Sequence, residues 1–355
     1  MTDDPDDGAA TESVPDDALL GLLEEGLFGA RPSMSQEEVA ERAGIPLDLA
    51  RELWHQLGFA HTQPGQVAFT EADERALRLT QDLIDLGVLS EDRRESLVRT
   101  WGRSFARLAE WQAALLADIA RETGLDPAES LVMLGEEALP KVEELQAYTW
   151  KRHLLSAGGR LLADTAQAHQ AGVCFVDIVG YTSRSRSLSA GELVDWLEAF
   201  ETKSLESVVE RGGRIIKNIG DELLIVADTA EEIAEIALDL VARGEDADDD
   251  FPAVRAGVAY GQVVSRLGDV YGPVVNIAAR LTSVARPGTV LVDLGMHDAL
   301  GGQPTDDAAA DHDEHDAHDA EHDDDSGPSA YRLRRLRRVS VKGYSRLKVW
   351  ALTRR

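Results

Sequence analysis

Apolar residues recur at intervals of three and four along the first part of the chain, which is the spacing of one face of a helix. Clear examples run from Leu19 to Leu27 and from Leu97 to Leu108. At residues 35–38 and 70–73 a hydroxyl side chain precedes a carboxylate by three positions, as in a capping box that opens a helix. Strand-like runs are almost absent, so residues 18–150 are predicted to form an all-helical domain.

The pattern changes near residue 150. Residues 157–159 contain two glycines and interrupt the helical spacing, so residues 151–170 are interpreted as a linker or switch segment. Apolar runs typical of buried strands then alternate with helical spacing. The strand-like runs cover residues 173–179, 214–219, 223–227 and 254–260, and the helical stretches cover residues 190–211 and 229–243.

This order, strand–helix–strand–strand–helix–strand, is that of a ferredoxin-like βαββαβ core. A further helix near residues 272–285 and late strands near 289–292 and 339–352 extend the core. The predicted fold class is therefore α+β, with an all-α domain preceding a ferredoxin-like domain.

Composition fits two packed domains, because the chain has 355 residues of which 43% are apolar. The one cysteine, Cys174, excludes a disulfide framework. Residues 1–17 lack the features of a signal peptide, and no apolar run approaches the roughly 20 residues of a membrane span. We therefore expect a cytoplasmic protein without a membrane span.

Most of the net charge of −29 comes from three acidic stretches that contain no lysine or arginine. These are residues 1–20, 245–250 and 301–330. Blocks of like charge repel one another and stay solvated, so residues 1–17 are expected to form a disordered tail and residues 301–330 a disordered insertion. The negative field also argues against nucleic acid as a partner, since such binding depends on neutralising phosphates.

Two carboxylates lie at the ends of neighbouring predicted strands. Asp177 ends the run at 173–179, and Asp221 follows Gly220 in a dipeptide typical of hairpin turns. These strands are adjacent in a βαββ core, so the two carboxylates can meet at one end of the sheet. Such a pair suits Mg²⁺ or Mn²⁺, although either aspartate taken alone is better explained as an ordinary turn residue.

Residues 268–280 add further polar groups. Asn276 and Arg280 are four positions apart, on one face of the predicted helix, and Asp269 precedes Asn276 by seven positions. Together with the two carboxylates, these residues favour a single functional site over a set of unrelated turn residues.

Three motifs together resemble the catalytic domain of class III adenylate cyclases. They are the strand end at residues 175–182, the hairpin from Lys217 to Asp221 and the segment 268–280. The resemblance covers residues 171–355, apart from the acidic insertion. It implies an enzyme that converts ATP into 3′,5′-cyclic AMP and pyrophosphate.

The resemblance also implies roles for the metal-binding half of the site. Asp177 and Asp221, with the backbone carbonyl of Ile178, would hold two divalent cations, Mg²⁺ or Mn²⁺, against the phosphates of ATP. Such ions lower the pKa of the ribose 3′-hydroxyl and clamp the triphosphate.

The remaining motif residues would contact the nucleoside and the α-phosphate. Lys217 would donate to an adenine ring nitrogen and Asp269 would accept from the exocyclic amine, whereas guanine presents the opposite pattern. Asn276 would orient the ribose. Arg280 would stabilise the charge on the α-phosphate as it becomes five-coordinate.

In this family the metal-binding aspartates come from one chain, and the nucleoside and transition-state residues come from the other. This chain has both sets, so the resemblance implies a head-to-tail homodimer with two shared active sites. Lys342, in the predicted closing hairpin, is a candidate ligand of the triphosphate, and a solvated strand lysine explains it nearly as well.

The N-terminal region leaves alternatives open. Residues 37–46 resemble the opening of a helix-turn-helix module, which would make the chain a DNA-binding regulator. The following residues 47–54 offer one arginine against two acids, so a helical packing unit is the better interpretation. The region also resembles the helical regulatory domain of soluble actinobacterial cyclases. A catalytically silent nucleotide-binding sensor is the other alternative, although no catalytic position is missing.

Histidines supply two further hypotheses. The insertion contains His312, His315, His318 and His322, whose spacing could bind Zn²⁺ or Ni²⁺, although solvated low-complexity sequence is the simpler interpretation. His153 and His169 flank the predicted linker. Histidine is the side chain type that can change charge near neutral pH, so pH is one candidate stimulus, and a passive role explains the two residues equally well.

Overall fold

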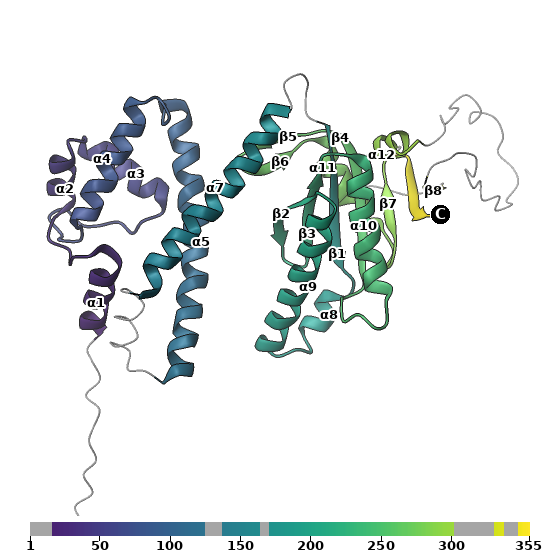
Figure 1. Ribbon diagram of the computed structural model, residues 1–355, viewed down its shortest axis with the longest axis horizontal. Coiled ribbons are helices and arrows are strands. Elements are labelled where there is room, and N and C mark those ends of the chain that lie inside the picture. The colour runs from purple at the N-terminus through teal and green to yellow at the C-terminus, as the bar shows by residue number, and fades with distance from the viewer. Residues whose placement is uncertain (1–15, 125–136, 164–169, 302–329, 337–346) are drawn as a thin grey trace, which may run out of the picture. The chain divides into compact units, whose positions relative to one another are not determined.

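The computed structural model describes residues 16–124, 137–163, 170–301, 330–336 and 347–355 (Figure 1). The chain divides into two compact units, residues 1–163 and 164–355. Residues 302–329 of the predicted insertion, with its four histidines, lie outside the described residues, and so do His169 and Lys342. So does the predicted tail up to residue 15, whereas Asp16 and Asp17 already belong to the first helix.

The first unit is helical, as the apolar spacing predicted. Its described helices are α1 (Asp16–Phe28), α2 (Gln36–Ala43), α3 (Leu47–Leu57), α4 (Glu71–Asp85), α5 (Glu91–Thr123) and α7 (Leu139–Ala163). The capping boxes expected at residues 35–38 and 70–73 both form, at the starts of α2 and α4. In the described parts of the chain, no helix has the length and apolarity needed to cross a membrane.

Helices α2 and α3 pack into a small core instead of presenting a basic surface. Trp54 stacks on Phe69 with ring centroids 4.6 Å apart. Arg51, the arginine of α3, donates through Nε to Oε1 of Gln36 at 3.0 Å, and its guanidinium lies 3.5 Å from Glu37. The cation that a helix-turn-helix module would offer to DNA is thus engaged within the unit, which favours the packing interpretation.

Helix α7 continues where an interruption was expected. It runs through Gly158 and Gly159 to Ala163, so the predicted break at residues 157–159 is wrong. A glycine costs a helix only about 1 kcal/mol relative to alanine, and leucines on both sides favour helix. Residues 151–163 of the predicted linker or switch segment are therefore helical, and His153 lies within this helix.

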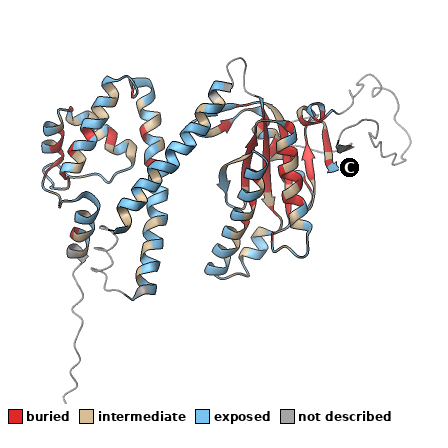
Figure 2. Cartoon of the chain, viewed as in Figure 1, coloured by how far each residue is buried: buried red, intermediate tan, exposed pale blue. Residues whose placement is uncertain are grey.

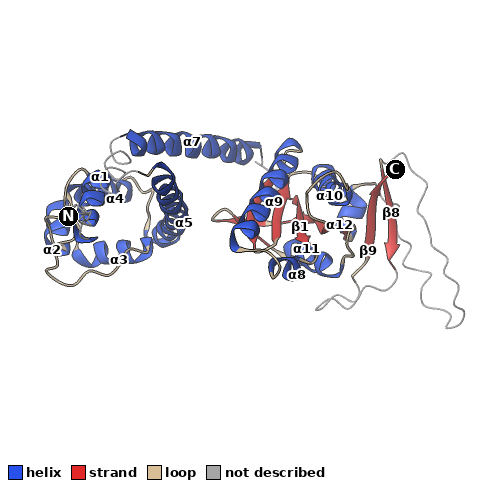
Figure 3. Ribbon diagram, turned by 90° about the horizontal axis from the view of Figure 1, so that it is seen from below, coloured by secondary structure: helices blue, strands red, loops and turns tan. Residues whose placement is uncertain are grey.

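The second unit contains a seven-stranded sheet whose first four strands in spatial order form the predicted ferredoxin-like core. Figure 3 shows the strands of this unit in red, among blue helices. Strand order is β2-β3-β1-β4-β7-β9-β8, with β8 at one edge. The strands are β1 (Gln170–Ile178), β2 (Arg214–Ile219), β3 (Glu222–Ala227), β4 (Val254–Gln262), β7 (Val290–Val292), β8 (Tyr331–Leu336) and β9 (Val349–Arg354). Neither β8 nor the short hairpin of β5 (Val264–Arg266) and β6 (Asp269–Tyr271) was predicted.

Helices cover both faces of this sheet, so its central strands are buried on both sides (Figure 2). Helices α9 (Ala190–Glu210) and α10 (Ala230–Glu245) pack with Cys174 and Val176 on one face. Helix α11 (Pro273–Val284) packs with Val173 and Phe175 on the other. Since strand residues alternate between faces, Asp177 lies on the face of α11. Short helices α8 (Tyr181–Ser185) and α12 (Leu294–Ala299) complete the unit.

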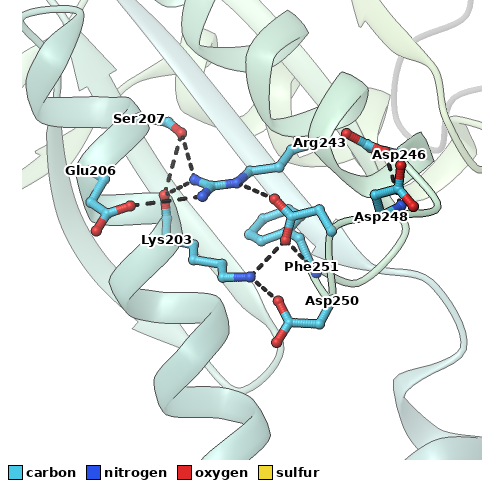
Figure 4. Close-up of polar contacts among 9 residues, drawn as sticks. Lys203, Glu206, Ser207, Arg243, Asp246, Asp248, Asp250 and Phe251 are labelled. Atoms are coloured by element: carbon cyan, nitrogen blue, oxygen red, sulfur yellow. Dashed lines mark hydrogen bonds and ion pairs between the residues drawn. The ribbon is translucent and has the colours of Figure 1, made fainter.

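The acidic run at residues 245–250 was expected to stay solvated, but part of it is held in ion pairs (Figure 4). Lys203 Nζ donates to Oδ1 of Asp249 at 2.6 Å and also contacts Asp250. Arg243 Nε donates to Oδ2 of Asp249 at 2.7 Å. We call these four residues the Asp249 cluster; they fasten the loop before β4 to α9 and α10.

Candidate active site

Asp177 lies in β1 one residue before the strand ends, between charged residues of the two neighbouring strands. It is opposite Glu222 of β3 and opposite Arg255 of β4. Arg255 donates through Nε to Oδ2 of Asp177 at 2.7 Å, and its Nη2 lies 2.6 Å from the same oxygen. The strand register thus places a guanidinium and a second carboxylate beside Asp177, which is 16% exposed.

Asp221 joins this group from the turn between β2 and β3. Gly220 has a φ of 65°, which glycine adopts without strain and which lets the hairpin turn tightly. The backbone N–H of Ile178 donates to the carbonyl of Asp221 at 3.2 Å, which ties the turn to the end of β1. The two aspartates predicted to meet at one end of the sheet are therefore neighbours.

Negative charge exceeds positive charge here. Burial, followed by the charges of Asp177 and Asp221, raises the pKa of Glu222 to about 7 against the pull of Arg255. Burial, and then Asp177, also raises the pKa of Asp221. We refer to Asp177, Asp221 and Glu222 as the site acids; three carboxylates share one guanidinium.

The donor set fits a divalent cation that also binds substrate. Within the described ranges, no group of three or more histidine, cysteine or acidic side chains has the arrangement of a metal site. The available ligands are the oxygens of Asp177 and Asp221 and the carbonyl of Ile178. Mg²⁺ and Mn²⁺ accept such incomplete protein shells, because phosphate oxygens and water fill the remaining positions.

Lys217 and Asp269 form a separate polar pair. Lys217 Nζ donates to Oδ2 of Asp269 at 2.5 Å, although 52 positions separate them. A bulge in β2 between Ile215 and Lys217 shifts the register there and re-aims the side chain of Lys217. Burial would raise the pKa of Asp269, but hydrogen bonds from Lys217 and the N–H of Val270 outweigh it and lower the pKa.

Helix α11 presents Asn276 and Arg280 on the face opposite its packed side. Its buried residues are Val274, Ala278, Leu281 and Thr282. Asn276 is exposed and Arg280 is intermediate. The structure therefore places these two side chains on the outer face of the helix, away from the sheet that carries their own chain's Asp177.

Two residues of the site were not identified from the sequence. Glu222 stood beside Asp221 without an assigned role, and Arg255 lay inside an apolar strand pattern. An arginine in such a run is the signal that could have been used, because a charged residue in a buried strand needs a partner. Its partner could be named only once the strand register was known.

Comparison with known proteins gives consistent matches. The family model described as adenylate and guanylate cyclase catalytic domain matches residues 164–316. An adenylate cyclase of Streptomyces coelicolor is 37% identical over 304 residues, covering 84% of this chain and 79% of the relative. One from Glutamicibacter nicotianae is 39% identical over 304 residues, covering 79% and 75%. A pH-sensitive adenylate cyclase of Mycobacterium tuberculosis is 32% identical over 287 residues, covering 77% and 72%.

Proposed function

The chain belongs to the class III adenylate cyclases, and we propose that it converts ATP into 3′,5′-cyclic AMP and pyrophosphate through a site built from the residues described above. In this reaction the ribose 3′-oxygen bonds to the α-phosphorus, the bond to the β-phosphate oxygen breaks, and the 3′-hydroxyl proton is released. The observation that carries the proposal is the pairing of an acidic strand end with a separate lysine–aspartate pair suited to adenine.

The site acids would hold the phosphate end of the substrate. Asp177, Asp221 and the carbonyl of Ile178 would bind two divalent cations, Mg²⁺ or Mn²⁺, which when present acidify the 3′-hydroxyl and neutralise the triphosphate. Arg255 contacts one oxygen of Asp177 through two nitrogens, which fixes the orientation of that carboxylate.

Lys217 and Asp269 would select the base. The lysine donates and the carboxylate accepts, which matches the ring nitrogen and the amine on one edge of adenine. On guanine that edge has an N–H and a carbonyl, so both contacts would be mismatched. Unpaired polar groups at a binding site reject the wrong substrate strongly.

Asn276 and Arg280 would act on the ribose and the α-phosphate. An amide can hold a ribose oxygen, and a guanidinium is permanently charged and planar, which suits the growing charge of the transition state. Both lie on the outer face of α11, which supports the proposal that they serve a site completed by another chain.

Exposed apolar side chains near Lys217 and Asp269 support a head-to-tail homodimer with two shared sites. Ile219, Val264, Leu267 and Tyr271 are 46%, 63%, 51% and 51% exposed. Such a group of apolar residues beside a polar site is typical of a surface that another protein covers. In a two-fold dimer the same surface serves both chains.

Complementation tests the shared site. Asp177→Ala and Arg280→Ala should each be nearly inactive, whereas a co-expressed heterodimer regains one site made from the two intact halves. Random pairing of equal amounts should restore about a quarter of wild-type cyclic AMP production. Verified heterodimers that stay as inactive as their parents would show that both halves come from one chain.

We also propose that the helical unit regulates catalysis. One relative is described as pH-sensitive, which supports pH as the first stimulus to test. Cyclic AMP production by the full chain and by residues 160–355 should then depend differently on pH. Identical profiles would assign no such role to the helical unit.

A further inference from the structure

Helix α11 meets the sheet at a point where β4 has no side chain. A Cβ on Gly257 would lie 2.2 Å from the backbone nitrogen of Thr282 and 2.4 Å from the carbonyl oxygen of Ala278. No side chain fits at those distances, so glycine is what allows the helix backbone to approach the strand. Ala278 itself is fully buried in this contact.

Thr282 uses this close approach to reach β1. It is 1% exposed, and its Oγ1 lies 3.1 Å from the carbonyl oxygen of Phe175 and 3.0 Å from that of Ala278. A threonine in a helix can satisfy its hydroxyl on the carbonyl four residues earlier. The hydroxyl has a single proton, which the two carbonyls share, and the contact with Phe175 is not required by local structure: it forms a polar link between α11 and the central strand.

The two ends of this link lie close to the two halves of the site. Phe175 precedes Asp177 by two residues, and Thr282 follows Arg280 by two. In the proposed dimer, the Asp177 and the Arg280 of one chain serve different active sites. The link therefore runs from the metal-binding half of one site to the transition-state half of the other.

We propose that Thr282 is a positioning residue that couples the two active sites of the dimer. Its hydroxyl, seated over Gly257, holds α11 in register with β1, so that the carboxylate of Asp177 and the guanidinium of Arg280 are set together. This inference rests on the proposed shared-site mechanism and adds to it a physical connection between the sites.

The first test separates positioning from folding. Thr282→Val removes the hydroxyl and keeps the shape of the side chain. Because a misplacement of about 1 Å at a reacting group can cost up to a hundredfold, we expect kcat to fall about tenfold. The KM for ATP should change less than about twofold, since Lys217 and Asp269 lie on other elements.

Conservative and matched variants complete that test. Thr282→Ser keeps the hydroxyl and should retain most of kcat, and Thr282→Ala should behave like the valine variant. Thr80→Val is the matched control, because the Thr80 hydroxyl donates to the carbonyl of Ala76 at 2.8 Å in a helix of the other unit. Thermal unfolding should show all four variants folded. A kcat of Thr282→Val equal to that of Thr80→Val would overturn the proposal.

The second test asks whether loss of the Thr282 hydroxyl from either chain lowers the activity of the working site. In the heterodimer of Asp177→Ala and Arg280→Ala, the one working site takes its metal half from the Arg280→Ala chain and its α11 from the Asp177→Ala chain. Thr282→Val is added to one chain or to the other. Local positioning of α11 predicts a loss only when the Asp177→Ala chain carries it, whereas coupling predicts a loss of severalfold in both arrangements.

The outcomes are distinguishable. Loss from both placements supports the coupling, and loss from one placement or from neither overturns it. The heterodimer without Thr282→Val is the reference. If that reference is inactive, the shared site itself is wrong and the coupling falls with it; if it is active, a negative result concerns Thr282 alone.

Discussion

The Asp249 cluster and the site acids are two groups of carboxylates in the same unit, and they differ in charge balance. Asp249 faces two cations, and the hydrogen bonds of Lys203 and then Arg243 hold the pKa of its carboxyl well below the usual range. Among the described residues, Arg255 is the cation that acts on Asp221 and Glu222, and their pKa values are raised mainly by burial, with a further contribution from neighbouring carboxylates.

This difference separates a structural cluster from a binding site. Where cations match carboxylates, the group is complete, and its contribution is to hold a loop. Where carboxylates exceed cations at the end of a strand, burial and mutual repulsion disfavour their negative charges, and a bound cation relieves this unfavourable electrostatic energy. Perturbed acids of this kind mark candidate functional sites.

The largest effect should come from the site acids themselves. Asp221→Asn and Asp177→Ala should each lower cyclic AMP production by at least about a hundredfold, because each removes a cation ligand. Since the folded state disfavours the charge of Asp221, Asp221→Asn should leave the thermal midpoint unchanged or higher. Activity above a few per cent of wild type in either variant would contradict the assignment.

The next prediction concerns the Lys217–Asp269 pair, which is balanced in charge but which we assign to substrate binding. Lys217 and Asp269 are paired as closely as the Asp249 cluster, yet we assign them to the base. The double variant Lys217→Glu, Asp269→Cys should lose ATP turnover by about a hundredfold or more. Asp228→Asn is the control. It removes the charge that pairs at 2.8 Å with Arg214, which lies on β2 as Lys217 does, and this variant should keep ATP turnover. Full ATP activity in the double variant would refute the selectivity argument.

A smaller effect is expected from the structural cluster. Asp249→Asn should lower the thermal midpoint by a few degrees, because it weakens bonds from Lys203 and Arg243, while kcat stays within about twofold. Asp250, 79% exposed and in contact with Lys203, offers the matched control Asp250→Asn, which should change neither. A loss of kcat without a loss of stability would place Asp249 in the catalytic machinery instead.

The smallest effect concerns the free energy of unfolding, to which Glu222 and Asp249 should contribute with opposite pH dependences. It is measured by chemical denaturation with a chelator present. The raised pKa of Glu222 means that stability falls as pH rises from about 4.5 to about 7. Glu222→Gln should therefore make stability less dependent on pH in that range. The lowered pKa of Asp249 means that its contribution is present above about pH 3.8 and lost as pH falls below it. The difference in stability between wild type and variant should therefore fall with pH for Glu222→Gln and rise with pH for Asp249→Asn, and differences that change in the same direction would contradict the comparison.

Much of this unit follows from sequence pattern. Strands β1 to β4 and helices α9 and α10 were predicted to within a few residues, because they are long, apolar and strongly periodic. The motif residues could be singled out from the sequence because they stand at strand ends, turns and one helix face, and their roles stay predictions. Strands β5 and β6 are only three residues long, which is too short for an alternating pattern to show.

The alignment of neighbouring strands and the partners of the ion pairs could not be predicted from the sequence. Which residue of β4 lies beside Asp177 depends on how the strands align, and a shift of one position would replace Arg255. The bulge before Lys217 likewise depends on tertiary packing. The acidic run containing Asp249 looked like solvated loop because its cations, Lys203 and Arg243, come from other elements.

The outermost strand has a consequence for how this protein behaves in concentrated solution. An edge strand offers unpaired backbone groups to which a strand of another molecule can add, and this is a common route to aggregation. Strand β8 lies at such an edge, and it carries Arg332, Arg334 and Arg335 around a single buried Leu333. Charged side chains on an edge strand are one of the features by which folded proteins disfavour the addition of a further strand.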